Sequence, residues 1–161
     1  MKRELDEYLC KVYPKMMVNR NKGMQETCMC WGFECGDGWF TLLDKLMGNI
    51  QHHLDWKNRE GDVVPQVTLD QVKEKFGTLR FYYTGGDDVI DGMVRMAESM
   101  SGTICEGCGG PATTSDVDPD IGIMGWIRTE CKPCEEKRLA ERDARLDEYE
   151  FKKLLKEGNE Q

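Results

Sequence analysis

Apolar residues recur at helical spacing in the first third of the chain. Between residues 39 and 54 they fall three or four positions apart, which predicts an amphipathic helix from Gly38 to about Trp56. Asp37 stands directly before this segment and is a suitable N-cap. A shorter pattern of the same kind predicts a helix over residues 2–12, which ends before Pro14.

The spacing of apolar residues changes to two in the segments "VTLD" and "LRFYY". Such alternation predicts two β-strands, and the segment "KEKFG" between them can turn the chain because glycine tolerates a positive φ. We therefore predict a β-hairpin whose apolar face covers the 38–56 helix. Leu79, Phe81 and Tyr83 should point into this core, whereas Arg80 and Tyr82 should point away from it.

A second amphipathic stretch follows the hairpin. Asp87 can cap a helix there, Ile90 and Val94 belong to its apolar stripe, and Gly102 should end it. The tail from Glu135 onward predicts a charged helix with few apolar positions. We expect that helix to be mostly solvated, and the alternative is a coiled coil or a partner-binding helix.

Two cysteine pairs give the clearest chemical signal. Cys105 and Cys108 are separated by two residues, and so are Cys131 and Cys134, with 22 residues between the pairs. This spacing is typical of a structural zinc site, since each pair can present two thiolates on one side of the chain. Four cysteines also leave no coordination position for water, so the zinc should be structural. An iron–sulfur or redox site is the alternative.

Four further cysteines have no standard ligand spacing. We expect them to be small buried apolar side chains near Trp31 and Phe33, and a second zinc ion held by all four is the alternative. They are Cys10, Cys28, Cys30 and Cys35.

Length and charge narrow the class of protein. The chain has 161 residues and a formal net charge of -8, which disfavours general binding to nucleic acid. Its first residues lack the apolar run of a signal peptide, and no segment reaches the roughly 18 apolar residues of a membrane span. We therefore expect a cytoplasmic protein without a membrane segment, in which cysteines bind metal more readily than they form disulfides. The oligomeric state is left open.

These patterns predict an α+β fold. A β-hairpin or small antiparallel sheet is packed by helices, followed by a four-cysteine zinc module of the treble-clef or ribbon kind and a charged C-terminal helix. The predicted division is an α+β core over 1–102, the zinc module over 103–138 and the charged helix over 139–161. His52 and His53 would be the catalytic candidates if the protein were a hydrolase or nuclease, but a pair on the helix surface is the simpler interpretation.

The segments "CGDGWFTLLDKL", "VKEKFGTLRFYYTGG" and "CEGCGGP", followed by "GWIRTECKPC", resemble a group of small proteins encoded by tailed phages and prophages. The resemblance covers residues 33–138 and implies an accessory protein that acts in the host cytoplasm. It supplies no catalytic residues. We expect a non-enzymatic protein that binds and modulates or inhibits a host protein, such as a component of host defence. A nucleic-acid-associated zinc-ribbon protein that modulates transcription is the alternative.

The expected contact surface is the outer face of the hairpin. Tyrosine and arginine are over-represented among interface hot spots, and Arg80 and Tyr82 alternate away from the predicted core. The same face carries cations beside aromatic rings, so contact with single-stranded nucleic acid is the alternative there.

Overall fold

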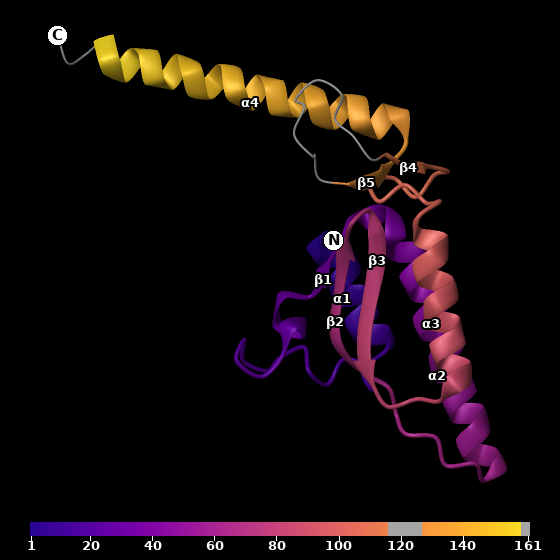
Figure 1. The fold of residues 1–161 in the computed structure, drawn as a ribbon. Helices are drawn as coiled ribbons and strands as arrows, with labels where there is room; N and C mark the ends of the chain where they lie inside the picture. The colour runs from indigo at the N-terminus through magenta and orange to yellow at the C-terminus, as the bar shows by residue number, and fades with distance from the viewer. Residues whose placement is uncertain (116–126, 159–161) are drawn as a thin grey trace. The chain divides into compact units, whose positions relative to one another are not determined.

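The computed structural model describes residues 1–115 and 127–158, which adopt an α+β fold (Figure 1). The predicted fold class is confirmed at this level. Two compact units are present, Met1–Glu130 and Cys131–Gln161. The elements are α1 (Arg3–Val12), the 3-10 turn η1 (Cys28–Trp31), β1 (Phe33–Glu34), the 3-10 turn η2 (Asp37–Trp39), α2 (Phe40–Glu60), β2 (Thr68–Lys75), β3 (Thr78–Thr84), α3 (Asp88–Ser101), β4 (Thr113–Ser115), β5 (Arg128–Glu130) and α4 (Lys132–Gly158).

The predicted hairpin is formed by β2 and β3, which pair antiparallel with Val72 opposite Phe81. The sheet is nevertheless mixed, because β1 adds a third strand that runs parallel to β2, with Phe33 opposite Val72. The expectation of an antiparallel sheet was therefore wrong for this strand. Two residues are too few to show a period, so nothing in the apolar pattern could predict β1.

Asp70 is an extra residue in β2. The register shifts between Leu69 and Gln71, so Leu69 lies opposite Tyr83 while Gln71 lies opposite Tyr82. This β-bulge lets Leu69 and Val72 both face the core although they are three positions apart. On β3, more buried and more exposed side chains alternate without such an interruption.

The core lies between the inner face of the sheet and the helices. Leu79 and Phe81 are buried as predicted, and Tyr83 is half-buried against the core. Tyr82 is 44% exposed. Helix α2 supplies a buried stripe at helical spacing, and α3 supplies a second one. The buried residues of these stripes are Leu43, Leu46, Met47, Ile50, Leu54, Ile90, Val94 and Ala97.

Helix α2 begins later than predicted and runs one turn further. Asp37 does not cap it, because the turn η2 stands between them and Trp39 occupies the N-cap position without a side-chain bond. The Asp37 carboxylate instead accepts a hydrogen bond of 2.7 Å from the backbone N–H of Lys2. Gly61 ends the helix in the left-handed conformation.

Helix α3 caps the outer edge of β3. Its Ser101 hydroxyl accepts a hydrogen bond of 2.8 Å from the N–H of Leu79, and Glu98 accepts one of 3.0 Å from the N–H of Phe81. Asp87 caps the helix as predicted, accepting from the N–H of Ile90 at 3.1 Å. Two backbone donors that this edge strand would otherwise expose to a neighbouring chain are thus occupied.

An ion pair ties the N-terminal segment together. The nearly buried carboxylate of Asp6 accepts hydrogen bonds from the Arg20 guanidinium at 2.8 Å and from the N–H of Phe33 at 3.1 Å. Arg20 also donates to the carbonyl of Cys30 at 2.9 Å. The pair therefore joins α1 to the loop that leads into β1.

The second unit is built on α4. Its surface carries ion pairs one turn apart, such as Lys152 with Glu148 at 2.6 Å, and Leu146 and Tyr149 are exposed. The predicted charged helix is present through Gly158, and residues 159–161 lie outside the described part, as do residues 116–126 of the predicted zinc module. The division at residues 102 and 138 stays a prediction. None of the helices in the described residues is long and apolar enough to span a membrane.

Candidate functional site

Four cysteines form the candidate metal centre. The sulfur atoms of Cys105, Cys108, Cys131 and Cys134 all lie within 4.8 Å of one another. A tetrahedral zinc ion with Zn–S bonds of about 2.3 Å requires sulfur separations of roughly 3.8 Å, so only small side-chain adjustments would complete the shell. The predicted ligands are therefore close enough to hold a metal ion.

The first cysteine pair lies on a tight turn. The N–H of Gly109 donates to the carbonyl of Cys105 at 2.8 Å, and the N–H of Cys105 donates to the carbonyl of Gly110 at 2.7 Å. Gly109 has a φ of 80°, which glycine adopts without the steric cost of a side chain. The sequence "CEGCGG" is thus suited to this turn, which holds Cys105 buried and Cys108 exposed.

This turn is seated directly on the segment before α2. The N–H of Gly38 donates to the carbonyl of Glu106 at 2.8 Å, and the Trp39 indole donates to the carbonyl of Ile104 at 2.8 Å. A Cβ at Gly38 would lie 2.1 Å from the carbonyl oxygen of Cys105, so only glycine permits this approach. The two glycines of the motif "CGDGW" are the sequence signal of this close backbone contact, since a Cβ at Gly36 would likewise lie 2.2 Å from the carbonyl oxygen of Glu106.

Glu106 adds a second connection to the same segment. Its carboxylate accepts a hydrogen bond of 2.8 Å from the N–H of Gly36, and burial raises the pKa of this carboxyl. Thr129 of β5 accepts from the N–H of Glu106 through its carbonyl and donates through its hydroxyl to the carbonyl of Gly77 at 2.6 Å. The first cysteine pair is thus joined both to the start of α2 and to the hairpin turn.

The second cysteine pair begins α4. The carbonyl of Cys131 accepts hydrogen bonds from two backbone N–H groups of the first helical turn, those of Cys134 at 2.9 Å and Glu135 at 3.0 Å. Cys131 and Cys134 therefore lie at the positive end of a helix dipole, which favours thiolate over thiol. A thiolate is the form that binds metal.

The other four cysteines have no comparable arrangement. Among residues 1–115 and 127–158, the four-cysteine centre is the only group of three or more ligand side chains close enough to hold an ion. Burial raises the pKa of Cys35 to about 12 and also raises that of Cys10, which favours their thiol forms. The thiol of Cys30 donates to the carbonyl of Thr27 at 3.2 Å. The expectation that all four are buried was wrong for Cys10, Cys28 and Cys30, which are half-buried because they lie near the surface of the N-terminal segment, whereas Cys35 is buried.

His53 does not lie on the helix surface. It is buried, and its Nε2 lies 2.8 Å from a carboxylate oxygen of Asp87, so the interpretation of both histidines as a surface pair was wrong for His53. His52 is exposed. The Asp87 carboxylate therefore joins α2 to the N-terminus of α3, because its other oxygen caps α3.

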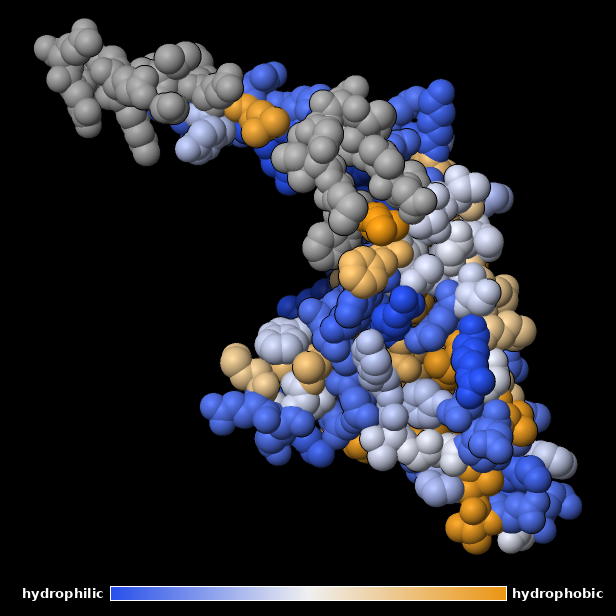
Figure 2. All heavy atoms as spheres, in the orientation of Figure 1, coloured by the Kyte–Doolittle hydropathy of each residue, from blue (hydrophilic) through white to orange (hydrophobic). Residues whose placement is uncertain are grey.

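The outer face of the sheet carries the predicted contact residues. Tyr82 and Gln71 lie opposite each other, and so do Arg80 and Lys73. The Lys73 ammonium lies 5.8 Å from the centre of the Tyr82 ring, and Arg80 donates to the hydroxyl of Thr78 at 2.6 Å. In the space-filling view this side of the molecule is largely hydrophilic (Figure 2). The structure thus brings Arg80 and Tyr82 onto one preformed face.

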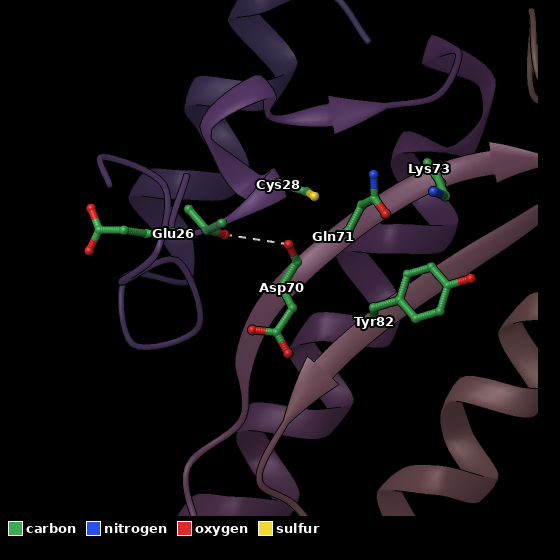
Figure 3. Close-up of a pocket in the computed structure, with 7 residues that line it drawn as sticks. Glu26, Cys28, Asp70, Gln71, Lys73 and Tyr82 are labelled. Atoms are coloured by element: carbon green, nitrogen blue, oxygen red, sulfur yellow. Dashed lines mark hydrogen bonds between the residues drawn. The ribbon is translucent and has the colours of Figure 1, made fainter. Parts of the chain in front are cut away.

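A shallow hollow lies beside Tyr82 (Figure 3). It has a volume of about 500 Å³ and is lined by β2, β3 and the segment that leads into η1. The hydroxyl of Thr27 donates to the carbonyl of Asp70 at 3.5 Å across it, while the Glu26 carboxylate points away from β2. The hollow belongs to the outer face, because Lys73 and Tyr82 line it.

Comparison with known proteins returned no counterpart. No protein-family model, no curated protein and no solved structure matches this chain.

Proposed function

We propose that this protein is a zinc-stabilised binding protein that modulates a partner protein through the outer face of its hairpin. The observation that supports its zinc-binding part is the four-cysteine centre, whose sulfur atoms lie within 4.8 Å of one another. Four thiolates favour zinc, and they leave no position at which a substrate or water could bind the metal. The metal would then hold the fold together and take no part in chemistry.

The order of elements around the cysteines supports a treble-clef-like module. A tight turn carries the first pair, the antiparallel strands β4 and β5 follow, and the second pair lies at the start of α4. Residues 105, 108, 131 and 134 would hold the ion, which would supply structural cross-linking and no reaction. Elemental analysis of the purified chain should give about one zinc per molecule, and iron with visible absorbance would contradict this assignment.

The outer face of the hairpin is the proposed contact surface because it stands on two paired strands and its side chains take no part in the core. Tyr82 is an amphipathic ring on a paired strand, and Arg80 and Lys73 place cations beside it. A side chain that is already held in place loses little conformational entropy when a partner binds. The resemblance to phage-encoded proteins makes a host protein the expected partner.

Nucleic acid is the second candidate, favoured by the two cations beside Tyr82. The net charge of -8 and the acidic neighbours Glu34 and Asp70 oppose it, because they repel phosphate. Nuclease treatment of the host lysate before affinity capture separates the two candidates: a protein partner is retained, whereas a nucleic acid and the proteins it carries are lost.

The experiment compares wild-type protein with Tyr82→Ala and with the control Val63→Ala, whose side chain is 90% exposed in a loop. A partner captured by wild type and the control, but weakened at least about tenfold by Tyr82→Ala, supports the outer face. Equal capture by all three proteins would refute this placement.

A further inference from the structure

The outer face of the hairpin concentrates positive charge in a chain that is acidic as a whole. Lys73 and Lys75 are two positions apart on β2 and therefore point to the same face, and Arg80 of β3 lies directly opposite Lys73. The whole chain has 22 lysine and arginine residues against 30 aspartate and glutamate residues. Three neighbouring cations therefore depart from the charge of the whole chain, and we call Lys73, Lys75 and Arg80 the basic row.

Neither Lys73 nor Arg80 forms an ion pair with another residue in the described part of the chain. Glu34 lies opposite Lys73 on β1, but its carboxylate accepts a hydrogen bond of 3.0 Å from the amide of Gln71. Like charges directly opposite each other on paired strands are destabilising. A carboxylate bound between Lys73 and Arg80 would reduce this repulsion and accept hydrogen bonds from both cations.

Exposed aromatic rings lie beside the two lysines. The Lys73 ammonium lies 5.8 Å from the centre of the Tyr82 ring, and the Lys75 ammonium lies 5.3 Å from that of Phe76. Phe76 is 65% exposed in the hairpin turn and has a φ of 54°, which a bulky side chain adopts only at a cost. Because such strain is common where a protein holds a ligand, Phe76 is a candidate contact residue. A ligand of the basic row should therefore offer apolar groups as well as carboxylates.

The start of β2 is acidic, unlike its end. Asp70 lines the same hollow as Lys73, and its carboxylate accepts hydrogen bonds from Asn19 at 3.3 Å and from Thr84 at 2.8 Å. A nucleic acid carries a phosphate on every nucleotide and would place phosphates near Asp70 and Glu34 as well as over the basic row. A peptide can instead carry acidic residues over the basic row and neutral residues over Asp70. The charge pattern of this face therefore favours an acidic peptide over a nucleic acid.

We propose, on the basis of the contact surface proposed above, that the outer face binds an extended acidic segment of a partner protein. Alternate side chains of an extended chain lie on one side at a spacing of about 7 Å, as those of Lys73 and Lys75 do on β2. One carboxylate of the segment lies between Lys73 and Arg80 and a second lies at Lys75, while an apolar side chain covers Phe76. Charge complementarity then selects the partner, and the aromatic rings add apolar contact.

Synthetic peptides test the proposal on the full metal-loaded chain. The probe is a fluorescein-labelled peptide in which glutamate alternates with serine and which ends in leucine, and the control peptide has glutamine at each glutamate position. Fluorescence anisotropy at low ionic strength should give a Kd on the order of 100 μM for the glutamate peptide, because a few exposed ion pairs contribute little affinity. The glutamine peptide should bind at least about tenfold more weakly, and added salt should weaken the binding of the glutamate peptide alone.

Single substitutions locate the binding on the outer face. Lys73→Gln should weaken the binding of the glutamate peptide at least about threefold, whereas Lys11→Gln, which removes the same charge from an exposed position on α1, should leave it unchanged. Phe76→Asn should also weaken the binding, although it relieves the strain in the turn and should raise the urea midpoint. Weaker binding by a more stable variant separates a contact role of Phe76 from a structural one.

Equal binding of the glutamate and glutamine peptides would overturn the proposal, and so would equal effects of Lys73→Gln and Lys11→Gln, since attraction would then depend on net charge alone. A short oligothymidylate that binds more tightly than the glutamate peptide would also overturn it and assign the face to single-stranded nucleic acid. If Tyr82→Ala weakens the capture of a partner but the glutamate peptide does not bind, the proposed contact surface stands and only the acidic chemistry of the partner is refuted.

Discussion

Gly38→Ala tests whether the metal centre and the core fold as one structure. The added Cβ would lie 2.1 Å from the carbonyl oxygen of Cys105 and 2.4 Å from the backbone nitrogen of Gly109. The first distance is about 1 Å shorter than carbon and oxygen tolerate, and both atoms belong to backbone that cannot rotate away. The turn that carries the first cysteine pair must therefore move.

The cost follows from the contacts that such a movement breaks. It separates the N–H of Gly38 from the carbonyl of Glu106 and the Trp39 indole from the carbonyl of Ile104. Two hydrogen bonds contribute about 1 kcal/mol each, and overpacking costs about 1–3 kcal/mol, so we expect a loss of about 3–5 kcal/mol in the free energy of unfolding. In the metal-free variant the turn can move and relieve part of this strain. Metal binding must then restore the strained conformation, so a relief of about 1.4 kcal/mol or more lowers the metal affinity at least about tenfold.

Two assays measure these effects: urea unfolding followed by tryptophan fluorescence, and competition for zinc with a coloured chelator. Gly92→Ala is the matched control, because its Cβ would meet no atom within 4 Å. In the helix interior this change should raise stability by about 0.5–1 kcal/mol and leave zinc affinity unchanged. If Gly38→Ala unfolds and binds zinc like wild type, the cysteine turn is not rigidly seated on the core and our reasoning fails.

Four further outcomes are expected. Removing zinc with a chelator should lower the thermal midpoint and restoring zinc should recover it, as calorimetry would show; equal midpoints would contradict a structural metal. Asp6→Ala should destabilise the fold by about 3 kcal/mol in urea titrations, since it leaves the Arg20 guanidinium without its carboxylate. Phe76→Asn should raise stability by about 1 kcal/mol, because Phe76 has a φ of 54° in the hairpin turn and asparagine tolerates that conformation better. Although burial opposes it, hydrogen bonds from His53 and from the N–H of Ile90 lower the pKa of Asp87. Its carboxylate therefore stabilises the fold above about pH 4 and ceases to do so as the pH falls through the lowered pKa, so Asp87→Asn should reduce the loss of stability in acid.

The sequence predicted those parts of the fold that are marked by a sustained apolar pattern or by a residue with a distinctive local role, such as a helix cap or a paired cysteine. Helix α2, the hairpin and the cap at Asp87 all follow from apolar spacing or from a capping side chain. The grouping of the four cysteines followed from their spacing, because a C-x2-C turn fixes two sulfur atoms locally. These features depend on interactions within a few residues, which a sequence pattern records.

The features that the sequence did not predict depend on contacts between distant residues. The strand β1 forms because Phe33 pairs with Val72, and the burial of His53 depends on Asp87, which is 34 positions away. The seating of the cysteine turn on Gly38 is of the same kind, since it depends on backbone from two parts of the chain. Local patterns carry no record of such pairs.

The capping of β3 by Ser101 and Glu98 has a consequence for how this protein can be recognised and how it can misassemble. With these two donors already occupied, an incoming peptide gains little by aligning its backbone along β3, so strand addition at this edge is disfavoured both for partners and for fibrils. Recognition at this part of the sheet then depends on the side chains that stand on its outer face. A variant that lacks both side-chain acceptors would keep the same outer face but expose the N–H groups of Leu79 and Phe81 to other chains. Helix α3 therefore protects this edge from aggregation in addition to forming part of the core.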